Sequence, residues 1–479
     1  MTTADLPAGV LARAGLSAAE VEDWSASAPG PLDSFPAAAE AVSVFLGRGQ
    51  ALIRHLPAPA ACTAGERAAR AAIGGVMNGA RDHFLRSHTA ALHDALTAGR
   101  TRPLRLGELV GEAAGLVPGL VPSPAEMNAE RARALPDKEG IELAHGLLIS
   151  HVLALPGPGR HLIGAMLRPT SEALERLAEL RDRGTADLGP VRVVRRGRAG
   201  ILELSNPRHL NAEDETTLAA TECGIDLILL DPAIEVGVLR GGVTQHPRYP
   251  GMRVFGAGIN LTHLYQGRID FLFYLRRDLG YVNKIYRGIV PAAQDLGAWA
   301  HIPGGSTAEK LWVAAVECFA IGGACQLLHV VDHVIATRGS RLFLPARKEG
   351  IIPGASNLRL PRFVGDRAAR QAILSGREWT AGDPDAALLC DEVVEPGEID
   401  QAIEARVAAL TDSGLANATA NRRALRAGQE PIDLFREYMA TYAHDQANCH
   451  LSPALVHNLE VHWHARSRAI PGSNDDFPA

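Results

Sequence analysis

The sequence predicts an α/β core placed between two helical regions, and three observations support this fold class. Residues 1–188 are rich in Ala, Leu, Arg and Glu at helical spacing, with almost no strand pattern. From Gly189 to about Glu395, short strand patterns alternate with helical ones, as in α/β proteins. Helical patterns return from Pro396. We therefore expect an all-helical N-terminal domain (1–188), an α/β core (189–395) and C-terminal helices (396–479).

In the N-terminal region, helical spacing is clearest over residues 61–93 and 171–183. Pro-Gly pairs at 118–119 and 156–159 separate candidate helices. No motif in this half carries recognisable chemistry.

The core begins with two predicted strands, joined by a basic turn at 195–198. Further strand patterns follow, then a pattern that predicts one long helix over 269–287, and a buried strand at 310–316. The first four predicted strands cover residues 191–194, 199–205, 233–241 and 252–255. Beyond residue 396, helices are expected over 398–410, 418–426 and 432–449.

Composition limits the class of protein. Hydrophobic residues make up 47% and charged residues 21%, as in globular proteins, and the formal net charge of -6 argues against a general nucleic-acid binder. No apolar run approaches membrane-spanning length, so we expect no membrane association and a cytoplasmic location. The six cysteines are scattered, which predicts reduced thiols.

The stretch from Val316 to His329 contains the strongest candidate for a ligand-binding turn. An apolar run reaches Gly322-Gly323 and then becomes helical, which predicts a buried strand, a tight turn and a helix start. Such a turn presents free backbone N–H groups to a ligand, and two glycines allow close approach. The same pattern also fits an ordinary strand-to-helix connection, so this stretch alone leaves both interpretations open.

Four segments, in order, resemble the crotonase (enoyl-CoA hydratase/isomerase) superfamily: 200–212, 255–261, 316–329 and 343–355. The resemblance implies a ββα-spiral core and a coenzyme A thioester substrate. It also implies that the N–H groups of Ile259 and Gly323 form an oxyanion hole for the thioester enolate.

Two departures from the family pattern are informative. Hydratases of this family use two glutamates, and the matching positions here hold Gln326 and Ala346. Neither side chain serves as an acid or base, so hydration by that machinery is not expected. Glu349 lies three residues beyond Ala346 and would need a different direction to replace it.

The combination resembles a branch of the family that dioxygenates aryl-acetyl-CoA without a cofactor. The resemblance implies that the substrate carbanion reduces O2 and that an arylglyoxylate and free coenzyme A are released, with no metal, flavin or haem. It also implies a role in supplying dihydroxyphenylglycine for glycopeptide antibiotics. By the same resemblance, Glu213, Arg277 and Gln326 position the ring and thioester.

Each of these residues also has an ordinary structural interpretation. Glu213 fits a helix N-terminal acid, Arg277 a solvated helix charge, and Gln326 a buried amide. Residues expected to contact substrate or coenzyme A are Arg208, Leu210, Asn211, Ala257, Leu261, Ala346 and Ile351. The arginines at 195, 196 and 198 fit either nucleotide phosphates or a solvated turn.

Two other functions stay open. One is a divergent hydratase, isomerase or thioester hydrolase that uses Glu213 or Glu349 as base. The other is a non-catalytic acyl-CoA-binding subunit. The family further implies a homo-oligomer, a trimer or dimer of trimers, with C-terminal helices such as 432–449 at its contacts. The tail histidines are predicted to lie on solvated helices and to bind no metal: His444, His450, His457, His462 and His464.

Overall fold

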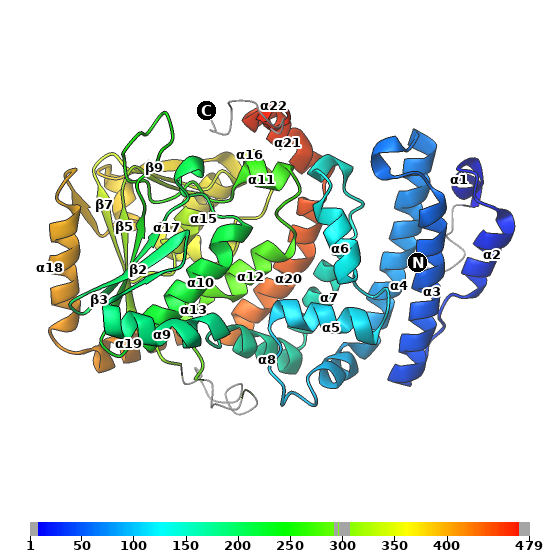
Figure 1. Ribbon diagram of the computed structural model, residues 1–479, viewed down its shortest axis with the longest axis horizontal. Helices are drawn as coiled ribbons and strands as arrows, with labels where there is room; N and C mark the ends of the chain where they lie inside the picture. The colour runs from blue at the N-terminus through cyan, green and yellow to red at the C-terminus, as the bar shows by residue number, and fades with distance from the viewer. Residues whose placement is uncertain (1–7, 292–295, 297–306, 469–479) are drawn as a thin grey trace.

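The computed structural model describes residues 8–291, 296 and 307–468 of the 479-residue chain. Residues 1–7 and 469–479, which the predicted N-terminal and C-terminal regions include, lie outside the described residues. Figure 1 shows the α/β part on the left and the N-terminal helices on the right. None of the described helices is long and apolar enough to cross a membrane.

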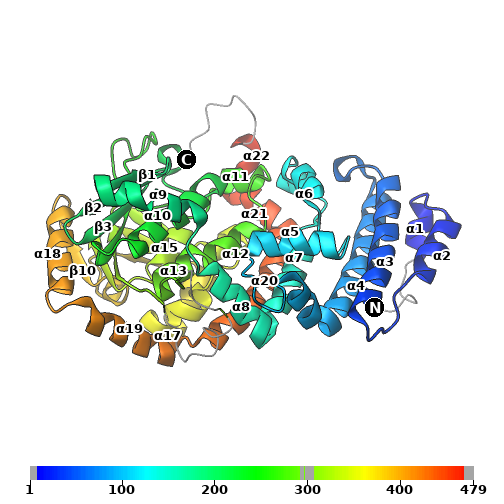
Figure 2. The same cartoon turned by 60° about the horizontal axis from the view of Figure 1, so that its bottom comes forward.

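The N-terminal region is helical, as predicted. Its longest helix, α4 (Ala64–Leu96), starts with a capping box in which Thr63 and Glu66 satisfy each other's backbone N–H groups. α4 packs along α3 (Phe35–His55) at the far end of the molecule (Figures 1 and 2). The other helices are α1 (Ala8–Arg13), α2 (Ala18–Ala26), α5 (Leu106–Leu116), α6 (Pro124–Arg131), α7 (Leu143–Ala154), α8 (Pro156–Met166) and α9 (Ser171–Arg183).

The core is built on a seven-stranded sheet in the order β1-β2-β3-β4-β5-β7-β10. The predicted hairpin is confirmed: β2 and β3 pair antiparallel, and β3, β4, β5, β7 and β10 then run parallel. The first strand, β1, lies a few residues before the predicted boundary at 189. The strands are β1 (Thr185–Asp187), β2 (Val191–Arg196), β3 (Ala199–Leu204), β4 (Val236–Gly241), β5 (Leu311–Val316), β7 (His333–Thr337) and β10 (Glu392–Val394).

A second, three-stranded sheet has the order β6-β8-β9. Its strands are β6 (Phe319–Ile321), β8 (Arg341–Phe343) and β9 (Glu378–Thr380). The chain leaves the large sheet after Val316, passes Cys318 at φ 62° and enters the small sheet at Phe319. The single strand predicted before Gly322 is therefore two strands in two sheets.

Two element predictions are wrong. The long helix expected over 269–287 is two helices, α12 (Leu272–Leu279) and α13 (Tyr281–Arg287), which meet at Gly280. Gly280 lies so close to the carbonyl of Arg276 that a Cβ atom would overlap it. Residues 252–255 form no strand, and this loop makes only isolated bridges, between Val243 and Arg253 and between Gly256 and Ala320.

The helices that follow each strand complete the core. They are α10 (Glu215–Leu230), α11 (Leu261–Tyr265), α15 (Gly323–Leu327), α16 (Ala346–Glu349) and α17 (Ser356–Ser375). The C-terminal helices are α18 (Ile399–Thr411), α19 (Leu415–Gln429), α20 (Ile432–His450), α21 (Pro453–Trp463) and α22 (Ala465–Arg468).

The C-terminal helix α20 returns to the N-terminal helices. It packs along α7 and also contacts α8, so much of its apolar surface is buried within the chain (Figure 1). The prediction that the tail histidines are solvated is wrong for His450, whose side chain is 0% exposed. His444, His457, His462 and His464 are exposed, as expected. All six cysteines are free thiols, which confirms that prediction.

Candidate active site

The candidate site lies beyond the C-terminal ends of the parallel strands β3, β4 and β5. This is the end of a parallel sheet where loops meet and ligands bind in α/β folds. The Gly322-Gly323 turn stands at its centre, with Gly322 at φ 53° and ψ −119° and Gly323 as the first residue of α15. The cavity beside this turn includes Glu213, Ile259, Arg277, Gly323 and Gln326, which are all five of the predicted catalytic residues.

Two loops press together at the turn. A Cβ atom added to Gly258, at φ +82°, would lie 2.8 Å from the carbonyl oxygen of Ile321 and 3.0 Å from the nitrogen of Gly323. Only glycine fits here, because both the backbone conformation and the space exclude a side chain. Within the described part of the chain, the N–H groups of Ile259 and Gly323 donate no hydrogen bond. Two neighbouring unpaired donors at a cavity are suited to bind an oxyanion.

Hydrogen bonds on each side of Ile259 hold its loop in place. The Glu213 N–H donates to Gly258 O at 2.7 Å, and the Asn260 N–H donates to Glu213 O at 2.8 Å. Asp214 accepts hydrogen bonds from the Asn260 amide and faces His263, both at 3.0 Å. Although burial opposes ionisation, the bonds from His263, Thr216 and Asn260 hold the pKa of Asp214 well below its usual value.

A buried ion pair lies against the turn. Arg277 Nε donates to Glu213 Oε2 at 2.8 Å, and Tyr281 OH donates to Glu213 Oε1. Glu213 is 5% and Arg277 4% exposed. A Cβ atom on Gly323 would overlap Glu213 Oε2, so the pair packs directly on the second glycine of the turn.

Arg277 also bonds the turn itself. It donates to the carbonyl oxygen of Gly323 at 2.6 Å and to Gln326 Oε1 at 2.8 Å. Although burial opposes its charge, Glu213, Tyr281 and Asp278 raise the pKa of Arg277, which keeps the guanidinium charged. One fixed cation therefore holds the peptide that follows Gly323, directly beside the Gly323 N–H.

Another part of the cavity lining comes from residues 344–352 and is mainly apolar, but it carries the carboxylate of Glu349. Leu344, Ala346 and Ile351 line this wall with Glu349, which is 5% exposed. In the described structure the Glu349 side chain has no hydrogen bond or ion pair. Burial alone raises the pKa of Glu349 to about 7.

The predicted substrate-binding residues separate into two groups. Ala346 and Ile351 line the cavity, whereas Leu261 is half-buried at the start of α11 and does not. The Asn211 amide donates to the carbonyls of Gly242 and Val254, at 2.8 and 2.7 Å, so it joins loops of the protein.

Two of the remaining predicted contacts, Arg208 and Leu210, lie on the loop after β3, where Arg208 is exposed. Ala257 lies on the loop after β4, and its N–H donates to Leu210 O at 3.1 Å. The turn at 195–198 lies at the other end of β3. There Arg195 pairs with Asp231 at 2.9 Å and Arg198 with Glu235 at 3.4 Å, so the structure does not bring these arginines to the site.

Several site residues escaped the sequence analysis. Asp278 comes directly after Arg277, and Tyr281 comes four residues after Arg277. Both lie in the stretch 269–287, for which the sequence pattern predicts one unbroken helix. Phe273 and Tyr274 from α12 and Tyr442 from α20 also line the cavity. Tyr442 is far away in sequence, and no local pattern could have placed it there.

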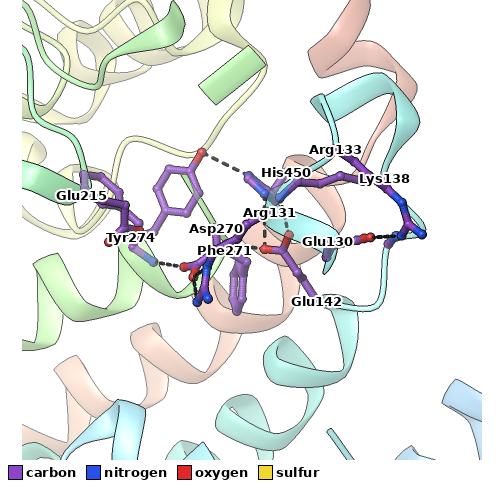
Figure 3. A network of polar contacts seen from close by, with 12 residues as sticks. Glu130, Arg131, Arg133, Lys138, Glu142, Glu215, Asp270, Phe271, Tyr274 and His450 are labelled. Atoms are coloured by element: carbon purple, nitrogen blue, oxygen red, sulfur yellow. Dashed lines mark hydrogen bonds and ion pairs between the residues drawn. The ribbon is translucent and has the colours of Figure 1, made fainter. Parts of the chain in front are cut away.

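A second buried polar network lies at the N-terminal end of α12 (Figure 3). Arg131 pairs with Asp270 at 2.6 Å, which joins α6 to the core. Glu142 accepts from Lys138 and from the Phe271 N–H, both at 2.5 Å. The Tyr274 hydroxyl points toward His450 Nδ1 at 3.4 Å, which brings α20 into the same network (Figure 3).

Comparison with known proteins agrees with this architecture. Residues 290–442 match the family model Enoyl-CoA hydratase/isomerase. A probable enoyl-CoA hydratase of Rhizobium meliloti is 30% identical over 42% of this chain and 68% of its own length. The crystal structure of enoyl-CoA hydratase from Bacillus halodurans superposes with a TM-score of 0.45 and 16% identity, covering 57% of this chain and all of that one.

The chain belongs to the enoyl-CoA hydratase/isomerase (crotonase) superfamily, which confirms the resemblance read from the sequence, and it has the crotonase fold in its C-terminal half. Its family within this class is that of the (3,5-dihydroxyphenyl)acetyl-CoA 1,2-dioxygenase of Amycolatopsis orientalis. That protein is 48% identical over 83% of this chain and 89% of its own length. The match extends into the helical N-terminal region, because 83% of the chain is far more than the core.

Proposed function

We propose that this protein is a dioxygenase that converts (3,5-dihydroxyphenyl)acetyl-CoA and O2 to the corresponding arylglyoxylate and free coenzyme A. The similarity to the relative of that name supports the substrate. The observation that carries the proposal is the site itself: an oxyanion hole is kept, while the hydratase glutamate positions hold Gln326 and Ala346.

The reaction starts with loss of an α-proton from the thioester. The resulting enolate oxygen binds the N–H groups of Ile259 and Gly323, where preorganised donors stabilise developing charge. The carbanion, delocalised into ring and thioester, donates electrons to O2. The peroxide formed at the α-carbon attacks the thioester carbonyl, and coenzyme A leaves as its thiolate, which gives a cyclic peroxide. Loss of the second α-proton forms the ketone and breaks the O–O bond, which leaves the carboxylate, and one released proton protonates the coenzyme A thiolate. Both oxygen atoms of O2 end in the arylglyoxylate, and no external reductant is required.

The polar side of the cavity suits the aryl group. Glu213, Arg277 and Gln326 supply acceptors and donors at one wall, which can meet ring hydroxyls. The apolar wall of Leu344, Ala346 and Ile351 excludes water from the carbanion. No group of three or more His, Cys, Asp or Glu among the residues described is arranged to hold a metal ion.

An oxygen electrode and a thiol assay test this function together. Purified, chelator-treated protein is supplied with (3,5-dihydroxyphenyl)acetyl-CoA. We expect one O2 consumed for each coenzyme A released, and the arylglyoxylate by mass spectrometry. Activity that disappears on chelation and returns with a metal would contradict the cofactor-free proposal.

A thioester hydrolase is the second candidate, because Glu349 is a free carboxylate in the cavity and could activate water. It predicts thiol release with no O2 uptake and a phenylacetate product. Absence of both signals would favour an acyl-CoA-binding subunit.

We also propose a homo-oligomer, a trimer or a dimer of trimers, because the chain belongs to the crotonase class. Since α20 already packs on α7, other surfaces must contribute most of the contacts. Light scattering coupled to size-exclusion chromatography measures the mass directly, and a monomer would contradict the proposal.

A further inference from the structure

The cavity holds two glutamates, Glu213 beside Gly323 and Glu349 beside Gly322, and their hydrogen-bond partners differ. Both oxygens of Glu213 accept hydrogen bonds, from Arg277 and from Tyr281. Glu349 has no such partner within the described residues, although it is equally buried. Arg277 and Tyr281 therefore occupy both oxygens of Glu213, whereas the oxygens of Glu349 are free to accept a proton.

The position of Glu349 relative to the oxyanion hole follows from the turn. Oε1 of Glu349 lies 3.8 Å from where a Cβ atom on Gly322 would stand. Gly322 immediately precedes Gly323, whose N–H is one of the two free donors. In a thioester the α-carbon is only two bonds from the carbonyl oxygen. A substrate whose oxygen binds at Gly323 can therefore present its α-carbon to this carboxylate.

The surroundings of Glu349 also match a base. Pro345, Ala346 and Ile352 belong to the same apolar wall, so no neighbouring cation fixes the carboxylate. Its raised pKa, about 7, lets it accept a proton near neutral pH. Burial and then the charge of Glu349 raise the pKa of Tyr274, and Tyr274 and Asp278 from α12 line the same cavity.

From this geometry we infer that Glu349 is the general base that removes the α-proton of the thioester substrate. The α C–H bond breaks and an O–H bond forms on the Glu349 carboxylate. The electron pair moves into the thioester carbonyl, and the enolate oxygen binds the N–H groups of Ile259 and Gly323. The inference rests on the proposed function and assigns the proton-transfer step that starts it.

From the sequence alone, Glu213 and Glu349 stay equally open as the base of an alternative function. The hydratase positions hold Gln326 and Ala346, and Glu349 reaches the cavity because α16 is a single turn ending at Gly350, which has φ +83°. The turn directs residue 349 inward while Arg347 and Lys348 face outward and are exposed.

The test compares wild type, Glu349→Gln and Lys348→Gln with ordinary and α-dideuterated (3,5-dihydroxyphenyl)acetyl-CoA. Glu349→Gln keeps the shape and removes the base. We expect its O2 uptake to fall by roughly 10² to 10⁴-fold, with a larger deuterium isotope effect than wild type, because C–H cleavage becomes limiting. Substrate Kd and the thermal midpoint should not worsen. Lys348→Gln removes a charge from the exposed side of the same helix and should match wild type.

Two results would overturn the inference. In the first, the O2 uptake rate of Glu349→Gln lies within tenfold of the wild-type rate. In the second, Glu349→Gln is slow but its deuterium isotope effect is no larger than that of wild type. The second result would mean a structural role. If wild type takes up no O2, the proposed function fails separately. In that case the exchange of α-deuterium with water, measured in the absence of O2, tests the proton-transfer step alone. Equal exchange rates in wild type and Glu349→Gln would reject Glu349 as the base.

Discussion

Helix α12 has a polar network at each end, and the two networks differ in one respect. At the N-terminal end, Asp270 and Glu142 are fully paired with cations and N–H groups from α6 and the loop before α7 (Figure 3). At the C-terminal end, Arg277 and Glu213 are equally well paired, but two N–H groups and Glu349 beside them are not. A ligand bound in this cavity would supply partners for the N–H groups of Ile259 and Gly323 and for Glu349.

The comparison also separates structural from chemical roles. The first network joins the N-terminal helices, α12 and α20, and therefore holds the helix that carries Arg277. The second network uses that helix to fix the oxyanion turn. Breaking the first should cost mainly stability, and breaking the second should cost mainly activity.

The largest effect is expected from Arg277→Met. The change leaves Glu213 as an unpaired buried charge and releases the Gly323 carbonyl. We expect turnover to fall by about 10³-fold or more and the free energy of unfolding by roughly 3 to 5 kcal/mol. O2 uptake and urea denaturation measure the two losses. Arg277→Lys keeps the charge without the planar fork, and near-normal activity in that variant would show that the geometry of the pair is unimportant.

Glu142→Gln tests the other end of α12. The buried Lys138 ammonium then lacks its anion, and the free energy of unfolding should fall by roughly 3 to 5 kcal/mol. Turnover of the folded variant should change only a few-fold, since no atom of Glu142 reaches the cavity. Glu139→Gln, at a more exposed pair with Arg70, is the control and should cost at most about 1 kcal/mol. A large loss of turnover at full stability would put Glu142 in the chemistry.

Gly258→Ala displaces one loop of the oxyanion hole from the other. The new Cβ atom meets Ile321 O at 2.8 Å and Gly323 N at 3.0 Å, so we expect a loss of about 10² to 10³-fold in kcat. Gly251→Ala is a matched control: its φ of +73° carries a similar backbone cost, but nothing lies within 4 Å of its Cβ position. Equal losses in both variants would mean that strain, not the oxyanion donors, explains the effect.

The smallest effect concerns the pH dependence of stability. Burial raises the pKa of Glu349 from 4.5 to about 7. Between these values the unfolded chain ionises while the folded one keeps its proton, so wild type loses stability as pH rises. Glu349→Gln lacks this loss. The difference in free energy of unfolding, variant minus wild type, should increase by about 3 kcal/mol between pH 4.5 and pH 7. Above pH 7 this difference should stay constant. Denaturation at several pH values measures the difference, and a difference independent of pH would show that Glu349 titrates normally.

The helical N-terminal region and the hairpin before residue 205 were predictable from the sequence, because helical spacing and turn residues are local properties. The oxyanion residues were predictable for a related reason. Gly258, Gly322 and Gly323 are needed for backbone conformation and close approach, and such requirements leave a recognisable glycine pattern.

Other features were not predictable, because each depends on a contact between distant segments. Glu213 pairs with Arg277 across 64 residues. The burial of His450 depends on α20 returning to α7. Sequence alone predicted an oxyanion hole without the hydratase glutamates. Only the tertiary structure decided that Glu213 is held by a guanidinium and that Glu349 is free, since the basicity of a carboxylate is set by neighbours that folding supplies.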